Sequence, residues 1–487
     1  MAAELLELLD REGAAIAIQD GDVPGGQISR RNMVAEIAAF AGTVSPAWHS
    51  GPPGSAWVAA RDRCLQVMAV LGCLACGPTA LPERTGPPQM FDTLAGVCPP
   101  ALVVSDDGDC DVARWAAARG VPVHLIRGAP GERIPAARSR GPVADSALQL
   151  FTSGTTGPVK CVSLRVPQLL AATAGVAGRL VLTESDTSLS IAPLTHTLGF
   201  VTSVLAGLLA GGRVAFADPQ RANALLRTVS AARPTWCAAS PSGLRLLHTI
   251  MSSGEATWPG LRFLRSSSAP LSDDLAAVLE GFFQVPVINA YVMTEAPGEI
   301  ASQDLAGERR RGTVGRPTLC EVEVRSPDAG TAAGEIWIRG PNVAVADHTD
   351  PDHDGPGHGL WTRTGDIGAF DDAGFLRVTG RTHDVINQGG VKVWPPEVEA
   401  AALQHPDVTA AVAFPIPHEG LGETVGLVVV PREGRAVDRT AVRRLLMADL
   451  PRDKWPSTIV VRGEVPLTAR GKVSRRRMWQ MLGVEAR

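Results

Sequence analysis

The chain has 487 residues, a formal net charge of −4 and 45% hydrophobic residues. That length is too great for one ordinary core and predicts two to four domains or subdomains. The arginines are scattered, so the chain lacks the basic stripe that nucleic-acid-binding proteins carry. Eight cysteines at irregular spacing do not resemble a disulfide framework. For Cys73-Leu-Ala-Cys76, a lone CxxC in an apolar run, buried packing is favoured over metal or redox chemistry.

The N-terminal ten residues are acidic and amphipathic, and they lack the basic start and the cleavage site of a signal peptide. The longest apolar stretch, about residues 194–217, is interrupted by His196, by glycines and by Arg213. It is therefore interpreted as a helix followed by a buried strand, and not as a membrane span. A cytoplasmic protein without a membrane span is expected.

From residue 147 onward, strand-like apolar runs alternate with segments of helical periodicity. Strands are predicted over 147–151, 188–191, 213–217, 236–239, 261–265 and 286–290, and helices over 167–180, 197–210, 220–232, 242–251 and 273–283. This alternation predicts an α/β fold with mostly parallel sheets, in which ligands bind in the loops after strand ends.

Beyond residue 301 the pattern changes to short strands, which are predicted over 321–325, 335–338 and 375–378 and indicate a small β subdomain. A polar stretch over 347–359 is expected to form an exposed loop. After Arg381 the pattern predicts a helix over 396–404, strands over 408–414 and 424–430, and a helix over 438–447. A boundary near 381–384 divides the chain into an N-terminal domain of residues 1–382 and a small α+β C-terminal domain of residues 383–487.

A loop rich in glycine and hydroxyl groups, Thr152-Ser-Gly-Thr-Thr-Gly157, follows one predicted strand and precedes Lys160. Glycines at these positions let backbone N–H groups and hydroxyls close around a phosphate chain, which the Lys160 ammonium would neutralise. No Gly-Lys-Ser/Thr sequence follows, so this is not a Walker loop.

The single tyrosine of the chain opens Tyr291-Val-Met-Thr-Glu295, which ends another predicted strand. The segment offers an aromatic face for a purine, a hydroxyl for phosphate and a carboxylate for Mg²⁺ at fixed offsets. Asp366 adds a carboxylate suited to ribose hydroxyls, and Arg381 lies at the predicted domain boundary. Lys472 is one of only four lysines. Lysines that persist in an arginine-rich chain are enriched where a compact ammonium must reach one oxygen.

Together and in this order, these motifs resemble the adenylate-forming superfamily of acyl-CoA ligases, nonribosomal-peptide adenylation domains and luciferases. The resemblance covers the whole chain and implies a large N-terminal α/β domain followed by a small, mobile C-terminal domain. It also implies a reaction in two steps. A carboxylate attacks the α-phosphate of ATP with Mg²⁺ bound, pyrophosphate leaves, and the thiol of coenzyme A then opens the acyl-AMP.

The resemblance implies a role for each motif. Thr294 would touch the α-phosphate, Glu295 would help hold Mg²⁺, and Lys472 would bridge the substrate carboxylate and the α-phosphate. The implied cofactor contacts are Thr152, Ser153, Gly154, Thr155, Thr156, Gly157 and Lys160 around the β- and γ-phosphates, Ser268, Ala269, Pro270, Asn289, Ala290 and Tyr291 at the nucleotide, Asp366 and Arg381 at the ribose, and Gly389 and Gly390 along the pantetheine path.

The chain departs from the family pattern at several of these sites. Val159 and Cys161 flank Lys160 where proline and glycine are usual, and Val292 replaces the glycine that commonly follows the tyrosine. His383 stands at the hinge position, which is usually aspartate or lysine. These departures bear on how efficiently the chain handles ATP and on whether it carries out both half-reactions.

A further segment, Ala192-Pro-Leu-Thr-His196-Thr-Leu-Gly199, resembles the one in which a histidine borders the acyl pocket of acyl- and aryl-CoA ligases. An α-ammonium group needs a negative counter-charge, so His196 argues against an α-amino acid. The expected pocket walls, residues 236–240 and 267–269, are mostly small or apolar, which favours a hydrophobic or aromatic carboxylic acid.

The leading hypothesis is an acyl-CoA ligase whose partners are a small carboxylic acid and coenzyme A. Two alternatives stay within the family: a stand-alone adenylation enzyme that loads a carrier-protein pantetheine, and a companion-dependent enzyme that catalyses one half-reaction. An alternative of another class is a catalytically silent nucleotide-binding regulatory protein, against which the retained Lys472, Glu295 and Asp366 argue. Nucleic acid is not an expected partner, and the oligomeric state stays open.

Overall fold

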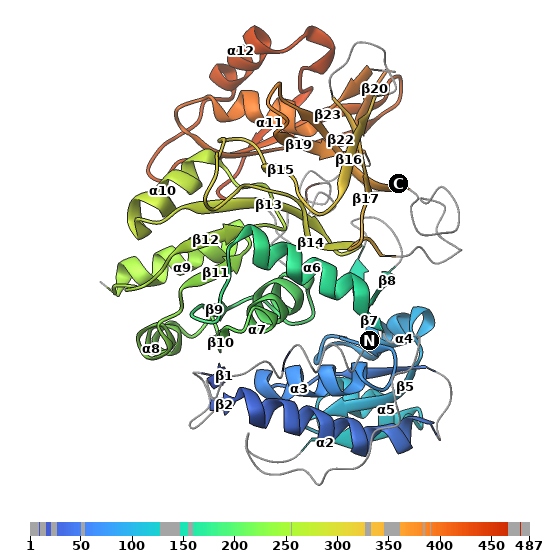
Figure 1. The fold of residues 1–487 in the computed structure, drawn as a ribbon. Coiled ribbons are helices and arrows are strands. Elements are labelled where there is room, and N and C mark those ends of the chain that lie inside the picture. The colour runs from blue at the N-terminus through green and yellow to red at the C-terminus, as the bar shows by residue number, and fades with distance from the viewer. Residues whose placement is uncertain are drawn as a thin grey trace. The chain divides into compact units, whose positions relative to one another are not determined.

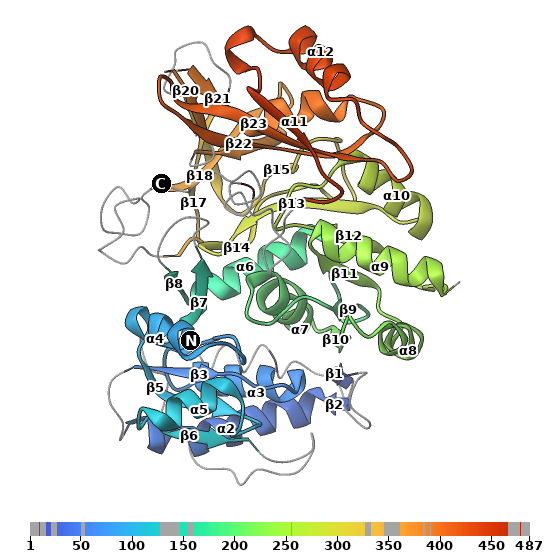
Figure 2. The ribbon, with the colours of Figure 1, turned by 180° about the vertical axis from the view of Figure 1, so that it is seen from behind.

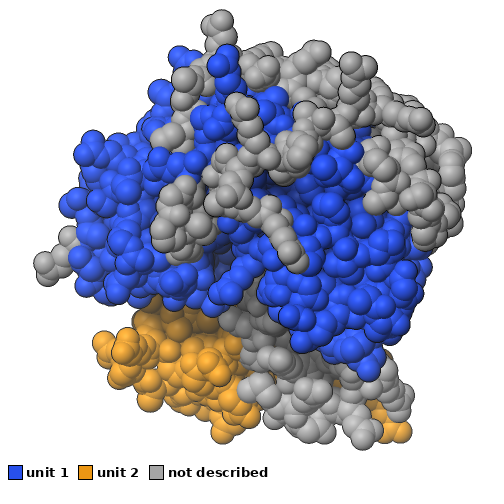
Figure 3. Space-filling view, turned by 90° about the horizontal axis from the view of Figure 1, so that it is seen from below, with its two compact units in different colours: residues 1–322, 338–362 blue, residues 323–337, 363–487 orange. Residues whose placement is uncertain are grey.

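The computed structural model describes residue 9 and residues 16–20, 27–49, 54–126, 147–153, 159–254, 256–326, 333–344, 361–382, 385–389, 391–465 and 478. These residues fall into two compact units, which Figure 3 colours separately. Unit 1 comprises residues 1–322 and 338–362, and unit 2 comprises residues 323–337 and 363–487. None of the described helices is both long enough and apolar enough to cross a membrane.

A nine-stranded sheet forms the centre of unit 1, in the order β15-β14-β13-β12-β11-β9-β10-β1-β2. Its strands are β1 (Ile16–Asp20), β2 (Gln27–Ser29), β9 (Thr187–Ser190), β10 (Arg213–Phe216), β11 (Trp236–Ala239), β12 (Phe263–Ser266), β13 (Val287–Met293), β14 (Ala296–Ser302) and β15 (Arg316–Pro317). The six strands from β13 through β1 in this order run parallel, whereas β14, β15 and β2 are antiparallel to their neighbours. The predicted parallel-rich α/β sheet is therefore confirmed.

Helices cover both faces of this sheet (Figures 1 and 2). One face packs against α6 (Val166–Arg179) and η1 (Leu198–Leu205), and the other packs against α8 (Ala222–Ala232), α9 (Pro241–Ser253) and α10 (Asp273–Phe283). The π-helix η1 continues into α7 (Ala206–Leu209), and every residue of η1 is buried. A helix that is apolar all round is stable only inside a core, which explains its central position.

A second sheet of unit 1 carries the glycine-rich loop and has the order β6-β5-β3-β4-β7-β8. Its strands are β3 (Ser55–Val58), β4 (Thr79–Ala80), β5 (Pro100–Ser105), β6 (Val123–Leu125), β7 (Ala147–Ser153) and β8 (Val159–Arg165), and the helices of this region are α2 (Arg30–His49), α3 (Arg63–Leu74), α4 (Pro88–Val97) and α5 (Asp111–Ala118). Cys73 and Cys76 are buried at the end of α3, as expected from the apolar run around them.

A four-stranded sheet contains the points where the chain passes between the two units. Its order is β16 (Glu321–Arg325), β17 (Gly334–Arg339), β18 (Thr362–Phe370) and β19 (Leu376–Arg381). The chain crosses at residues 322/323, 337/338 and 362/363, and each crossing falls within a strand of this sheet.

Unit 2 also contains a five-stranded sheet with its own core. The strands are β20 (Ile386–Gln388), β21 (Val391–Val393), β22 (Val408–His418), β23 (Gly422–Pro431) and β24 (Thr458–Val461), and the helices are α11 (Pro395–Leu403), α12 (Arg439–Asp449) and the short 3₁₀ turn η3 (Arg452–Lys454). The apolar sides of α11 and α12 pack with these strands in one cluster of buried residues. The predicted small α+β fold of this region is confirmed.

Candidate active site

Three of the predicted ligand-contacting segments follow the carboxyl ends of strands that share the central sheet. The segment with His196 follows β9, Ser268–Pro270 follows β12, and Thr294 follows β13. Because β9, β12 and β13 all run in one direction, their carboxyl ends lie at the same edge of the sheet. Ligands of open α/β sheets bind outside that edge, so the fold brings these segments to one place.

Tyr291 and the two residues proposed for phosphate and Mg²⁺ lie on one hairpin. Tyr291 is a buried residue of β13 and pairs with Ala301 of β14, and Met293 pairs with Ala296. Thr294 and Glu295 are therefore the two residues of the turn itself, and both are half-buried. The Glu295 carbonyl accepts a hydrogen bond of 2.6 Å from the Ala344 N–H. The turn is thus held at its backbone, and Glu295 lies at the sheet edge.

The glycine-rich loop closes a second hairpin, which β7 and β8 form. Thr152 pairs with Lys160, and Ser153 pairs with Val159. Gly154, Thr155, Thr156 and Gly157, which are the tip of the predicted phosphate loop, lie outside the described residues, as does the side chain of Ser153. The two ends of the loop are fixed by strand pairing, and Lys160 is exposed directly beside it.

His196 lies in the tight passage between β9 and η1. Its N–H donates to the Pro193 carbonyl (3.2 Å), and its carbonyl accepts from the Phe200 N–H (2.9 Å). A Cβ atom at Gly199 would lie 2.1 Å from the Pro193 oxygen, so only glycine permits this close approach. The histidine itself is half-buried.

Ser268 has a backbone conformation that serine seldom adopts. Its φ is +71°, and its side chain is exposed, whereas the preceding Ser267 is buried. A non-glycine residue in the left-handed region is strained, and such strain tends to occur at ligand-binding turns. This turn begins the segment Ser268–Pro270, which was predicted to contact the nucleotide.

Valine at position 268 is expected to destabilise the fold by about 1–3 kcal/mol, because a β-branched residue tolerates a positive φ least. Glycine is the matched control, since it adopts this conformation without strain. Urea unfolding of Ser268→Val and Ser268→Gly measures the difference. Equal stability of the two variants would show that the turn relaxes to an ordinary conformation.

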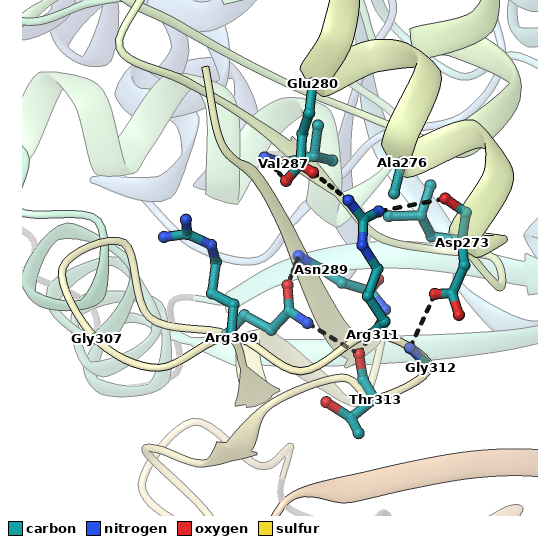
Figure 4. Close-up of a pocket in the computed structure, with 12 residues that line it drawn as sticks. Asp273, Ala276, Glu280, Val287, Asn289, Gly307, Arg309, Arg311, Gly312 and Thr313 are labelled. Carbon is teal, nitrogen blue, oxygen red and sulfur yellow. Dashed lines mark hydrogen bonds and ion pairs between the residues drawn. The ribbon is translucent and has the colours of Figure 1, made fainter. Parts of the chain in front are cut away.

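A polar cavity of about 270 Å³ lies between α10 and residues 303–313 (Figure 4). Asn289, one of the predicted nucleotide contacts, forms part of its wall and donates to the Thr313 carbonyl (2.9 Å). The opposite wall is held by Arg311, which pairs with Glu280 and donates to the Asp273 carbonyl (3.2 Å). Leu271, the residue after Pro270, also lines the cavity. The cavity therefore adjoins two of the predicted nucleotide segments.

A buried ion pair that the sequence analysis missed lies beneath η1. Arg265 of β12 and Glu299 of β14 are almost fully buried, with Arg265 Nη2 at 3.4 Å from Glu299 Oε1. Arg265 also donates to the Gly298 carbonyl (2.7 Å) and to Thr202 Oγ1 of η1 (3.4 Å). Arg265 Nε and Glu299 Oε2 have no hydrogen-bond partner in the described part of the chain. Burial raises the pKa of Glu299, and Arg265 opposes that effect.

Buried hydroxyls accompany this pair. Ser188 and Ser190 of β9, and Ser266 and Ser267 at the end of β12, each have a buried Oγ without a hydrogen-bond partner among the described residues. Strand register places Ser188 beside Trp236, and Trp236 beside Phe263, on the sheet face that η1 covers. The core beneath η1 is therefore mixed, since it combines aromatic carbon with hydroxyl groups and a charged pair.

Asp366 and Arg381, the two predicted ribose contacts, lie side by side in unit 2. They are paired residues of β18 and β19, and Arg381 Nε donates to Asp366 Oδ1 at 2.7 Å. Asp366 is buried and Arg381 is exposed. Their contact with a ribose stays a prediction.

Gly389 occupies the turn between β20 and β21, with φ +60°. Its N–H donates to the Leu421 carbonyl (3.0 Å), and a Cβ atom would lie 2.9 Å from Leu421 Cδ2. Turn geometry alone thus requires glycine here, whether or not pantetheine passes. Gly390, His383 and Lys472 lie outside the described residues, so their predicted roles stay predictions.

Two family models match the chain. The model described as AMP-binding enzyme matches residues 56–345, and the model described as AMP-binding enzyme C-terminal domain matches residues 397–472. The first match alone covers more than half of the chain. Both sheets of unit 1 contribute strands to the first range, and the five-stranded sheet of unit 2 contributes strands to the second.

Individual proteins agree with these matches. The chain is 32% identical over 436 residues to "Probable CoA ligase CCL9" of Humulus lupulus, covering 84% of this chain and 83% of that protein. It is 36% identical over 349 residues to "Oxalate--CoA ligase" of Arabidopsis thaliana, covering 68% of this chain and 66% of that protein. Its fold matches the crystal structure of ATP-bound MatB from Rhodopseudomonas palustris with a TM-score of 0.84 at 25% identity, covering 99% of both chains. The chain therefore belongs to the AMP-binding enzyme family, in the acyl-CoA ligase branch of the adenylate-forming enzymes.

Proposed function

We propose that this chain activates a small-molecule carboxylic acid with ATP and transfers the acyl group to coenzyme A. The observation that carries the proposal is the gathering of His196, Ser268 and the Thr294–Glu295 turn at the carboxyl edge of one parallel sheet. A carboxylate is a poor electrophile, so its conversion to an acyl-AMP makes attack by a thiol possible. Thioester formation then releases AMP.

The residues at this edge suit the first half-reaction. The Tyr291 ring would stack on adenine, the Thr294 hydroxyl would reach the α-phosphate, and the hairpin of Thr152 and Lys160 would hold the outer phosphates. Mg²⁺ is usually bound by one or two carboxylates together with substrate phosphates, and the single half-buried Glu295 carboxylate at the turn fits that requirement. When bound, the ion would neutralise negative charge on the phosphates.

Residues of the C-terminal domain are assigned to both half-reactions. We place Lys472, Gly389 and Gly390 on a C-terminal domain of residues 383–487, with Lys472 serving acyl-AMP formation and the glycines serving pantetheine entry. Transfer to a carrier-protein pantetheine and catalysis of a single half-reaction are the competing assignments. They differ from the proposal in the acceptor and in the products, and not in the nucleotide chemistry.

Two substrate classes are candidates. Residues 236–240 and 267–269, most of which are small or apolar, favour the hydrophobic or aromatic acid expected from the sequence. The second candidate is an acid with an additional polar or charged group, because Arg265 Nε and the Ser267 hydroxyl are buried without partners among the described residues. Buried polar groups are normally hydrogen-bonded, so a ligand that supplies the missing partner is favoured. Oxalate, named for one relative, has this chemistry.

Product analysis tests both levels of the proposal. The enzyme is incubated with ATP, Mg²⁺ and one acid from a panel of hexanoate, benzoate, oxalate and malonate, with coenzyme A or a phosphopantetheinyl carrier protein as acceptor. We expect pyrophosphate, AMP and acyl-CoA in equal amounts with one class of acid. Acyl-AMP without a CoA thioester would support the carrier or single-step assignments, and no pyrophosphate with any acid would contradict the proposed chemistry.

A further inference from the structure

Two cysteine thiols from distant parts of the chain meet beneath α4. Cys98 caps the C-terminal end of α4, and Cys161 lies on β8 opposite Phe151 of β7. The α4 helix packs against β8, which is the edge strand of the six-stranded sheet (Figure 1). Cys98, Phe151 and Cys161 belong to one apolar cluster, and a side-chain hydrogen bond connects the two thiols. The two thiols therefore lie close together in the folded chain, where α4 meets β8.

The surroundings of Cys98 are polar for so buried a thiol. Its Sγ lies 3.5 Å from Ser55 Oγ and 3.3 Å from Gln149 Oε1, and its carbonyl accepts from Trp57 Nε1 (3.1 Å). The hydrogen bond with Cys161 lowers the pKa of Cys98 to about 7; burial opposes this effect, and Ser55 and Trp57 assist it. The lowered pKa favours the thiolate of Cys98, and thiolate is the reactive form of cysteine.

The other close pair of cysteines provides a contrast. Cys73 and Cys76 lie at the end of α3 in the apolar core, where burial and the neighbouring Cys76 raise the pKa of Cys73. Thiols in such surroundings stay protonated and unreactive. If peroxide oxidises Cys98 and Cys161 but not Cys73 and Cys76, the cause is therefore the surroundings of the thiols, since both pairs lie close together.

Cys161 also lies close to the phosphate loop, so a displacement of this residue would move one end of the loop. It follows Lys160 directly, and the pairing of Lys160 with Thr152 closes the β7–β8 hairpin that carries the loop. Cys161 is half-buried and Cys98 is 3% exposed, so a dissolved oxidant reaches Cys161 first. The reachable sulfur and its partner together have the arrangement of a redox-sensing cysteine beside a resolving cysteine.

We propose that Cys98 and Cys161 form a reversible disulfide, and that this cross-link weakens ATP binding by shifting the hairpin that carries the phosphate loop. The oxidant is a hydroperoxide. The Cys161 thiol gives up its proton as its sulfur attacks one peroxide oxygen, and the O–O bond breaks, which gives a sulfenic acid and water. The Cys98 thiolate then attacks the Cys161 sulfur, forms the S–S bond and expels hydroxide, which leaves as water. Two thiols have lost two electrons and two protons, and the peroxide has become two waters.

The expected effect on ATP follows from the geometry of the bond. A disulfide holds its sulfur atoms about 2.05 Å apart, well inside the separation of two hydrogen-bonded sulfurs. Closing that gap draws β8 and the end of α4 together at the residue beside Lys160. A displacement of about 1 Å in a positioning element can lower catalysis by roughly 10²-fold.

The cross-link is tested first by chemistry that does not depend on the proposed function. The reduced full-length protein is treated with hydrogen peroxide, remaining thiols are alkylated, and the peptides are mapped by mass spectrometry. We expect a Cys98–Cys161 linked peptide that dithiothreitol removes, and alkylated, unlinked Cys73 and Cys76. Absence of the linked peptide, or equal linkage of both pairs, overturns the proposal.

The effect on the hairpin is tested by direct ATP binding in a calorimeter. Oxidised protein is expected to bind ATP at least about tenfold more weakly than reduced protein, with recovery after dithiothreitol. Cys98→Ser should bind ATP as the reduced protein does, both before and after peroxide, because it cannot form the bond. If the protein with the Cys98–Cys161 disulfide bound ATP as tightly as the reduced protein, the proposed effect on ATP binding would be overturned. If even the reduced protein bound no ATP, the proposed function would fail while the peptide map still decided the cross-link.

Discussion

Replacing Glu295 by glutamine is expected to lower the rate of acyl-AMP formation by about 10²- to 10³-fold, the effect typical of removing one electrostatic contact to a transition state. The amide keeps the size of the side chain but removes the charge that attracts Mg²⁺. The backbone of the turn should be unaffected, because its anchor is the hydrogen bond from Ala344 to the Glu295 carbonyl. The apparent affinity for Mg²⁺ should fall together with the rate.

Pyrophosphate release at varied Mg²⁺ measures this first half-reaction, and thioester formation from supplied acyl-AMP measures the second. The second rate should fall much less, since pyrophosphate, whose charge the ion would neutralise, has already left before that step. Glu308→Gln is the matched control, because Glu308 is an exposed carboxylate that pairs with Arg310 and Arg316. A Glu295→Gln enzyme with equal losses in both steps would contradict the assigned role.

Replacing Arg265 by methionine is expected to reduce the free energy of unfolding by about 3–5 kcal/mol, because it leaves the Glu299 carboxylate buried without a counter-charge. The double variant Arg265→Met with Glu299→Leu should recover most of this loss, since apolar residues of similar volume often replace a buried ion pair without destabilising the fold. Urea unfolding of the two variants and the native chain gives the comparison. Equal stability of the single and double variants would show that Glu299 finds another partner.

The loss in Arg265→Met should depend on pH. Burial raises the folded-state pKa of Glu299 above its ordinary value of 4.5, and removal of Arg265 raises it further. The folded state then binds more protons than the unfolded state above that ordinary value, so stability falls as pH rises. The variant should therefore be closer to the native chain at pH 5 than at pH 8. The double variant also tests the second substrate candidate, because a stable protein that has lost activity only toward oxalate and malonate would assign the pair to recognition.

The sequence predicted best those elements that begin at a residue with a strong effect on the backbone, such as a proline or an N-cap serine. Strand β11 and helix α10 were predicted to the residue, because Pro234 precedes the first and the Ser272 cap begins the second. Strand β8 was missed because Lys160, Ser163 and Arg165 dilute its apolar pattern. Strand β14 was missed because it contains proline, glycine and a glutamate, and this buried glutamate, Glu299, has its partner Arg265 34 positions away.

At the candidate site, motifs that are contiguous along the chain could be predicted, whereas contacts between distant residues could not. Segments such as Tyr291–Glu295 could be predicted, because their chemistry is contiguous along the chain. Arg265 carried a weak signal, as a charge at the end of an apolar run, but nothing local indicated Glu299 as its partner. Contact between Cys98 and Cys161, and the positive φ of Ser268, arise only from tertiary packing. The π-helical hydrogen bonding of η1 also cannot be read from a hydropathy pattern.

The chain passes between the two units three times, within β16, β17 and β18, and this limits how the protein can be divided into separately expressed fragments. No single cut separates the two units, because residues 323–337 of unit 2 are followed by residues 338–362 of unit 1. A recombinant fragment that starts at residue 383 would lack β18, β19 and the Asp366–Arg381 pair. Complementation of split halves, or circular permutation, is therefore better aimed at the β23–α12 connection, which lies wholly inside unit 2.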